Sequence, residues 1–215
     1  MFYETKLNNH GLPHDPLKAC LVPRPIGWIT SMSPDGVANL APYSFFNGVS
    51  SEPPMIMFAS NGKQPYGRKD TLANVESTKE FVVNFVTAEL KDKMNDSCAP
   101  LRPDDSEFEF AKIEKLDSHL IMAPRVKGAP VHLECKHYNT YDLPSNSSDV
   151  RNAIVVGSVV GVHIDEHFLV DGKLDITKMR PLARLGYMDY CIVDEVFQMK
   201  RPAAPPSYMT SNSKN

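Results

Sequence analysis

The sequence of 215 residues lacks the usual marks of a metal site and of a nucleic-acid-binding surface. Its four cysteines are scattered, and no two of them have the C-x-x-C spacing that is typical of metal and redox sites. Acidic residues slightly outnumber basic ones, which gives a formal net charge of -3 and a pI of about 6.2. Because nucleic-acid-binding domains usually carry clustered basic charge, we expect no nucleic-acid partner.

Long apolar runs are also missing. No run approaches the roughly 18 residues that suggest a membrane-spanning helix, so we expect no membrane association. Residues 1–15 contain no apolar stretch, so we expect no signal peptide. Together with cysteines that we interpret as reduced, these features predict a cytoplasmic protein.

Two nucleotide-binding motifs are absent, namely G-x-G-x-x-G and G-x-x-x-x-G-K-[ST]. The stretch "HIDEH" (163–167) formally fits the zinc protease pattern H-x-x-E-H, which requires a helix. Here it ends a β-branched segment, and on a strand the two histidines would stand about 13 Å apart. We therefore expect no metal site, and spacing alone selects no catalytic triad.

The hydrophobic pattern predicts mainly strands. The expected strands are 26–33, 37–50, 55–60, 80–87, 131–143, 152–165 and 189–200, and the expected helices are roughly 71–78 and 88–97. Pro42 predicts an edge strand or a bulge, and Gly157 and Gly161 predict bulges or close approaches. Such a set favours an antiparallel barrel or sandwich with helical additions, in one domain over residues 1–200 with a flexible tail at 201–215.

The stretch "GRKDTLANV" (67–75) places cations at an expected helix start. Arg68 and Lys69 suit a phosphate, because a helix N-terminus binds anions and a guanidinium can contact two oxygens. The hydroxyl of Thr71 would complete the cradle, whereas Asp70 would orient the loop, since its charge repels an anion. A solvated basic loop before a helix capped by Asp70 or Thr71 explains the same residues.

Hydroxyls, amides and aromatic rings gather in two other segments, "SMSPDGVANLAPYSFFNGVSSEPP" (31–54) and "MFASNG" (57–62). With the basic loop, they suit an aromatic heterocycle on a polar chain with a terminal phosphate. Ser44, Asn47, Ser50 and Ser51 could bind a ribityl-like chain. The aromatic residues Trp28, Tyr43 and Phe45 could equally belong to the core.

Several segments together resemble the flavin reductase-like family of FMN-binding split-barrel proteins, over roughly residues 20–195. The resemblance is carried by "PRPIGWITSMSPDGVANLAPYSFFNGVSSEPPMIMF", "RKDTLANV", "EFVVNFV", "VVGSVVGVHID" and "RPLARLGY". It implies a mainly β fold with α additions, a six-stranded antiparallel Greek-key split barrel. It also implies a homodimer with FMN near the dimer interface.

The resemblance also implies a set of FMN-binding residues. They are Thr30, Ser31, Met32, Tyr43, Ser44, Phe45, Asn47, Ser50, Ser51, Ser60, the phosphate-binding loop Arg68, Lys69, Asp70 and Thr71, and Arg184 of the "RLG" stretch. This chain has "RLGYMDY" where many relatives carry a second glycine and a later tyrosine, which leaves the roles of Tyr187 and Tyr190 open.

The implied activity is transfer of hydride from NADH or NADPH to flavin. The alternative within the family is an FMN-containing electron carrier of the flavoredoxin type without nicotinamide activity. In either case the flavin ring supplies the chemistry, so no catalytic acid–base residue is expected. A flavin barrel of the pyridoxamine-phosphate oxidase kind fits the motifs less well.

Overall fold

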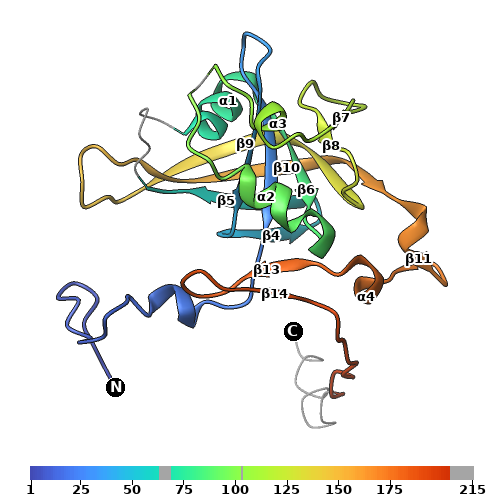
Figure 1. The fold of residues 1–215 in the computed structure, drawn as a ribbon. Helices are drawn as coiled ribbons and strands as arrows, with labels where there is room; N and C mark the ends of the chain where they lie inside the picture. The colour runs from blue at the N-terminus through green and yellow to red at the C-terminus, as the bar shows by residue number, and fades with distance from the viewer. Residues whose placement is uncertain (63–68, 103, 204–215) are drawn as a thin grey trace, which may run out of the picture.

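An antiparallel sheet forms the body of the computed structural model, which describes residues 1–62, 69–102 and 104–203 (Figure 1). Its strand order is β3-β2-β6-β9-β10-β5-β4. The strands are β2 (Gly27–Met32), β3 (Ala38–Tyr43), β4 (Phe46–Ser51), β5 (Pro54–Ser60), β6 (Glu80–Phe85), β9 (Val131–Leu143) and β10 (Asn152–Ile164).

A smaller three-stranded sheet lies beneath the main sheet in Figure 1 and joins the two ends of the chain. It consists of β1 (Arg24–Pro25), β13 (Leu182–Arg184) and β14 (Tyr190–Ile192). Two short hairpins complete the strands: β7 (Lys115–Leu116) with β8 (Arg125–Val126), and β11 (Leu169–Val170) with β12 (Lys173–Leu174).

The helices are short. They are α1 (Asp70–Thr78), α2 (Lys91–Asp96), α3 (Glu107–Phe110) and α4 (Ile176–Met179), with 3-10 turns η1 (Leu17–Cys20), η2 (Ala88–Leu90) and η3 (Glu166–Phe168). Helices α1 and α3 pack on strands of the main sheet. None of the helices in the described parts of the chain is long and apolar enough to cross a membrane.

The core consists of two main apolar clusters on the main sheet. One contains Trp28, which is fully buried and donates from Nε1 to the Ser97 hydroxyl at 2.9 Å. The other contains Phe58 and Phe81, whose rings meet edge to face at 5.4 Å, and includes Leu72 of α1. Burial of this apolar face fixes α1 against β2 and β3, so the helix start lies beside the end of β3.

The expected hairpin partner 37–50 is two strands, because the chain turns at Ser44 and Phe45 and β4 pairs with β5 instead. The main sheet therefore has seven strands, and the expected count of six is wrong. Within the described residues no ladder joins β3 to β4, so hydrogen bonds do not close the sheet into a barrel. The Greek-key detail is not confirmed, whereas the mainly antiparallel β architecture is.

The predictions from proline and glycine are confirmed. Pro42 lies on β3, which is an end strand of the sheet, and it stands opposite Trp28. Register shifts occur at Gly157 and at Gly161. A Cβ at Gly157 would lie 2.5 Å from the Phe81 ring, so this position has room only for a residue without a side chain.

The expected strand 189–200 is mostly wrong. Only Tyr190–Ile192 pairs, with β13, and residues 193–200 have no regular structure. Residues 201–203 are exposed, and the rest of the predicted tail lies outside the described residues.

Candidate functional site

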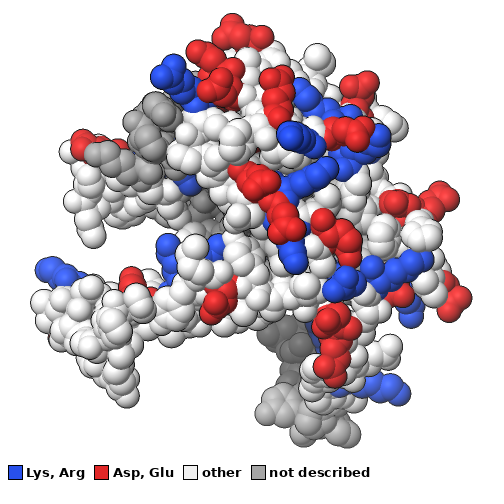
Figure 2. Space-filling view, viewed as in Figure 1, with Lys and Arg blue, Asp and Glu red and all other residues white. Residues whose placement is uncertain are grey.

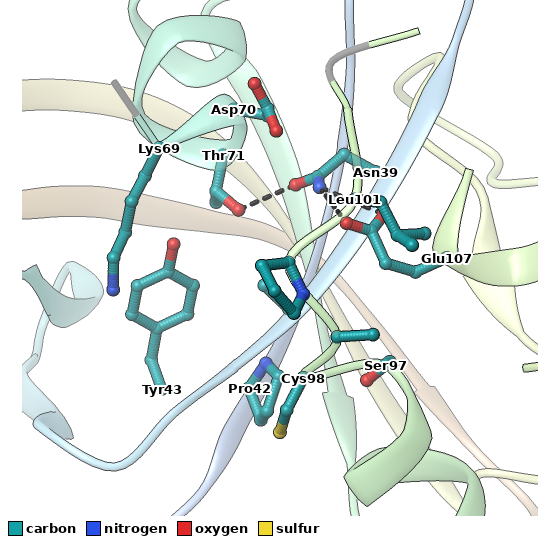
Figure 3. A pocket seen from close by; sticks show the side chains of 13 residues that line it. Asn39, Pro42, Tyr43, Lys69, Asp70, Thr71, Ser97, Cys98, Leu101 and Glu107 are labelled. Atoms are coloured by element: carbon teal, nitrogen blue, oxygen red, sulfur yellow. Dashed lines mark hydrogen bonds between the residues drawn. The ribbon is translucent and has the colours of Figure 1, made fainter. Parts of the chain in front are cut away.

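A cavity of about 250 Å³ opens where β3 meets the start of α1 (Figure 3). The segment 97–101 and Glu107 of α3 form its other walls. The lining residues are Asn39, Ala41, Pro42, Tyr43, Lys69, Asp70, Thr71, Ser97, Cys98, Ala99, Pro100, Leu101 and Glu107. Sequence-distant segments thus meet at one place because α1 is packed on the sheet.

A buried hydrogen-bond network forms one side of this cavity. The Asn39 amide nitrogen donates to both carboxylate oxygens of Glu107 at 3.0 Å, and the Thr71 hydroxyl donates to Asn39 Oδ1 at 2.7 Å (Figure 3). The Leu40 N–H donates to Glu107 at 3.0 Å. Burial raises the pKa of Glu107, although the Leu40 and Asn39 hydrogen bonds oppose this shift.

Tyr43 presents an unused donor. Its side chain is 4% exposed, and its hydroxyl oxygen is buried without a hydrogen-bond partner among the described residues. Burial raises the pKa of Tyr43 to about 12, with partial opposition from the hydroxyls of Thr71 and Ser60. The phenol therefore stays protonated at neutral pH and can donate to a ligand. A buried polar atom without a hydrogen bond lowers the stability of the fold unless a ligand or a water molecule bonds to it.

A second cavity of about 240 Å³ adjoins the first, and Lys69 lines both. The lining residues of this second cavity are Lys18, Arg24, Ser44, Phe45, Ala59, Asn61, Lys69, Arg184 and Tyr187. Four of them are cations and none is a carboxylate. Figure 2 shows blue Lys and Arg side chains on the walls of the hollow between the main body and the N-terminal segment. Such a wall attracts anions.

Arg24 lies close to a second cation, Arg184, in this second cavity. The Arg24 guanidinium donates to the carbonyls of Lys18, Leu21 and Leu185 at 2.7–2.9 Å. Burial lowers the pKa of Arg24, and the nearby charge of Arg184 lowers it further. The Asn61 Oδ1 is buried here without a partner among the described residues. An anion would relieve the repulsion between the two guanidinium groups.

Lys69 stands directly before α1. Its backbone is extended, and no side chain of the described residues caps the helix, so there the N–H groups of the first turn are left to an anion. Its Nζ lies 5.2 Å from the centre of the Tyr43 ring. Burial lowers the pKa of Lys69, with opposition from Cys98 and a further decrease from Lys18. A bound anion would favour the charged form.

The structure brings part of the predicted site together. Tyr43, Ser44, Phe45, Lys69, Asp70, Thr71 and Arg184 line the two cavities. The buried Ser60 lies next to the Tyr43 hydroxyl. Arg68 lies outside the described residues.

The other predicted residues that the structure describes do not line either of these two cavities. Thr30 and Ser31 of β2 are fully buried, and the Thr30 hydroxyl accepts from the Asn84 amide at 2.8 Å. Met32 is half-buried at the end of β2. Asn47, Ser50 and Ser51 are exposed on the end strand β4. Their FMN contacts stay predictions.

The predicted roles of the Thr71 and Asp70 side chains as helix caps are wrong. Lys69 occupies the cap position, Asp70 is already in the helix, and the Thr71 hydroxyl donates to Asn39. Because this proton is committed to Asn39, Thr71 can offer a ligand only a lone pair. This differs from the expectation that its hydroxyl donates to a phosphate.

Sequence reasoning missed the lining residues outside the predicted set. Those with charged or amide side chains are Lys18, Arg24, Asn39, Asn61 and Glu107. Arg24 and Asn39 lie within the quoted motif segment, so their position there was a usable signal. Glu107 lies in the segment 98–130, which the sequence presents only as loop-rich, and it carries no local signal.

The "HIDEH" stretch ends a strand as expected. His163 lies on β10 and its Nε2 is 2.5 Å from the buried Glu134 carboxylate, whereas His167 lies in the turn η3. The described residues contain no group of three or more His, Cys, Asp or Glu side chains placed to hold a metal ion.

Comparisons with known proteins add the following similarities. A family model described as "Flavin reductase like domain" matches residues 19–179. A protein from Aquifex aeolicus is 39% identical over 171 residues, which are 77% of this chain and 82% of that protein. The nitrilotriacetate monooxygenase component B structure from Bacillus cereus is similar with a TM-score of 0.84 and 30% identity, over 93% of this chain and 98% of that one.

The architecture is also similar to a structure from Shewanella frigidimarina named as a candidate flavin reductase with a split barrel domain. The TM-score is 0.79 at 19% identity, over 94% of this chain and 100% of that one. At this identity the similarity concerns the fold alone.

Proposed function

Because the chain belongs to the flavin reductase-like family, we propose that it is an oxidoreductase that holds FMN and passes hydride to it from NADH or NADPH. The family membership and the split-barrel fold confirm the resemblance that the sequence motifs indicated. The single observation that carries the proposal is the carboxylate-free cationic cavity beside the start of α1.

The residues present fit an FMN phosphate, which carries a charge of about -1.5 to -2 at neutral pH. Lys69, Arg184 and the N–H groups of the first turn of α1 supply charge and donors. The Tyr43 hydroxyl and the Asn61 carbonyl oxygen are a buried donor and acceptor next to this position, and neither has a partner among the described residues. A phosphate linked to a polyhydroxyl chain can accept a hydrogen bond from the Tyr43 hydroxyl and donate one to the Asn61 oxygen.

When bound, FMN supplies a ring that accepts hydride and releases electrons. The residues of this chain bind and orient it. Lys69 and Arg184 neutralise the phosphate, Tyr43 donates from a protonated phenol, and the apolar wall of Pro42, Pro100 and Leu101 excludes water. None of these roles requires a proton to be exchanged during turnover.

We propose that the working unit is a homodimer, as the motifs implied. An apolar row crosses one end of the main sheet, since Val83 stands opposite Leu133 and Leu133 opposite Val162. Val162 is 57% exposed. Next to this row lies a cavity of about 450 Å³ whose lining includes Phe46, Phe85 and Val131. A second copy would cover this face.

The experiment is flavin-dependent oxidation of NADH and NADPH by the purified chain, together with its absorption spectrum before and after FMN addition. We expect flavin bands that persist through gel filtration, and turnover with one of the two donors. FMN binding without turnover would contradict the nicotinamide part and favour the electron carrier. Absence of FMN binding would contradict the whole proposal.

A further inference from the structure

Glu107 is a buried carboxylate that the proposed chemistry does not use. It is 6% exposed at the start of α3, and within the described residues it has no ion-pair partner. Its three hydrogen bonds all come from β3, namely two from the Asn39 amide and one from the Leu40 N–H. Burying a carboxylate costs free energy unless hydrogen bonds compensate for the lost water. Because all of these donors lie on β3, we interpret Glu107 as a residue that positions this strand.

The carboxylate fixes which way the Asn39 amide faces. An ionised carboxylate only accepts hydrogen bonds, so Asn39 must present its NH₂ group to Glu107 and its Oδ1 to the opposite side. On that side Oδ1 accepts from the Thr71 hydroxyl at 2.7 Å and from the Ser31 hydroxyl at 3.3 Å. The Ser31 oxygen in turn accepts from Asn74 of α1 at 3.3 Å.

These bonds tie α1 to the main sheet at two points. Thr71 in its first turn bonds Asn39 of β3, and Asn74, three residues later, bonds Ser31 of β2. Thr71 follows Lys69 by two positions, so the same contacts set where Lys69 and the N–H groups of the first turn lie. In Figure 3, Asn39 and Thr71 lie between Glu107 and Lys69, and Lys69 also lines the cationic cavity.

We propose that Glu107 is a positioning residue for the phosphate end of FMN, acting through Asn39 and Thr71 on the start of α1. This inference rests on the proposed function. It predicts that a loss of Glu107 weakens binding of the phosphate and leaves binding of the rest of the flavin in place.

The test is a fluorescence titration of the full chain with FMN and, in parallel, with riboflavin, which lacks the phosphate. In Glu107→Gln one NH₂ group would face the NH₂ of Asn39, so the network loses its fixed direction. We expect the affinity for FMN to fall by about tenfold and that for riboflavin to change by less than about twofold. Glu114→Gln is the matched control, because Glu114 is exposed and forms an ion pair with Lys127, away from the Asn39 network.

A second pair of variants keeps the test decisive if Glu107→Gln fails to fold, as circular dichroism would show. Thr71→Val removes the link to Asn39 and should give the same selective loss, whereas Thr71→Ser keeps the hydroxyl and should restore FMN affinity. Equal losses for FMN and riboflavin, or no loss, would overturn the positioning role alone. A wild-type chain that binds neither flavin would overturn the proposed function and this inference with it.

Discussion

Individual side chains in this fold have properties that follow from burial, and His132 shows this most directly. It is 4% exposed, and its Nε2 lies 2.8 Å from the Val126 carbonyl oxygen. Burial lowers the pKa of His132 to about 4, with Arg125 and His163 adding to the shift and Glu134 opposing it. The native state thus holds this ring neutral where an unfolded histidine already binds a proton.

The first prediction concerns stability against pH. Because the folded pKa of about 4 lies below the ordinary histidine pKa of 6.5, the unfolded state gains a proton first as the pH falls. The free energy of unfolding should therefore drop by about 2 kcal/mol between pH 7 and pH 5 on account of this residue. Urea unfolding at both pH values should show a flatter dependence in His132→Gln and an unchanged one in His167→Gln, an exposed control. Equal pH dependence in all three proteins would contradict it.

Gly157 gives a second prediction at this scale. An added Cβ would lie 2.5 Å from the ring of Phe81, which is fully buried. Gly157→Ala should therefore lower the free energy of unfolding by about 1 to 3 kcal/mol through overpacking. Gly48→Ala is the matched control on another strand, where nothing lies within 4 Å of the new Cβ. If Phe81→Leu added to Gly157→Ala fails to recover stability, the ring contact is not the cause.

At the scale of elements, helix α1 connects the fold to the site. Its extent was predicted to within one residue, because an apolar and polar mix at helical spacing follows a polar loop. The strands β9 and β10 were equally readable, since long β-branched segments between turn residues indicate strands locally. By contrast, the pairing of Arg24 with Arg184 and the contact of Glu107 with Asn39 join residues far apart in sequence. No local sequence pattern predicts such contacts. The sequence therefore indicated Ser44, Phe45, Lys69 and Arg184 of the cationic cavity but not Lys18, Arg24 or Asn61.

The start of α1 provides the next prediction. Lys69→Met keeps the apolar stem and removes the charge, so the affinity for FMN should fall by about 10- to 100-fold while that for riboflavin stays nearly constant. The double variant Arg68→Ala with Lys69→Ala should release FMN without loss of the fold. Fluorescence titration measures the affinities, with Lys173→Met as a control at an exposed lysine of β12. Wild-type affinity in the double variant would remove the phosphate assignment.

The whole molecule has an apolar sheet face that a single copy leaves partly uncovered. Ile164 stands opposite Val131 and continues the row formed by Val83, Leu133 and Val162. Val162 and Ile164 are 57% and 41% exposed. Because the rows of adjacent strands lie on one face, these side chains form a continuous surface beside an apolar cavity. That surface is the physical basis of the dimer that we propose, which the sequence motifs implied only by resemblance.

The last prediction tests this surface. We expect light scattering at micromolar concentration to give twice the chain mass of 24.0 kDa for the wild type. Val162→Asp would bury an unpaired carboxylate in the interface, so it should raise the dissociation constant of the dimer by at least about a hundredfold and give a monomer. Val162→Thr has nearly the same shape without a charge and should remain dimeric. If the wild type is a monomer, this face has no second copy on it. If Val162→Asp stays dimeric, the copies meet elsewhere on the molecule.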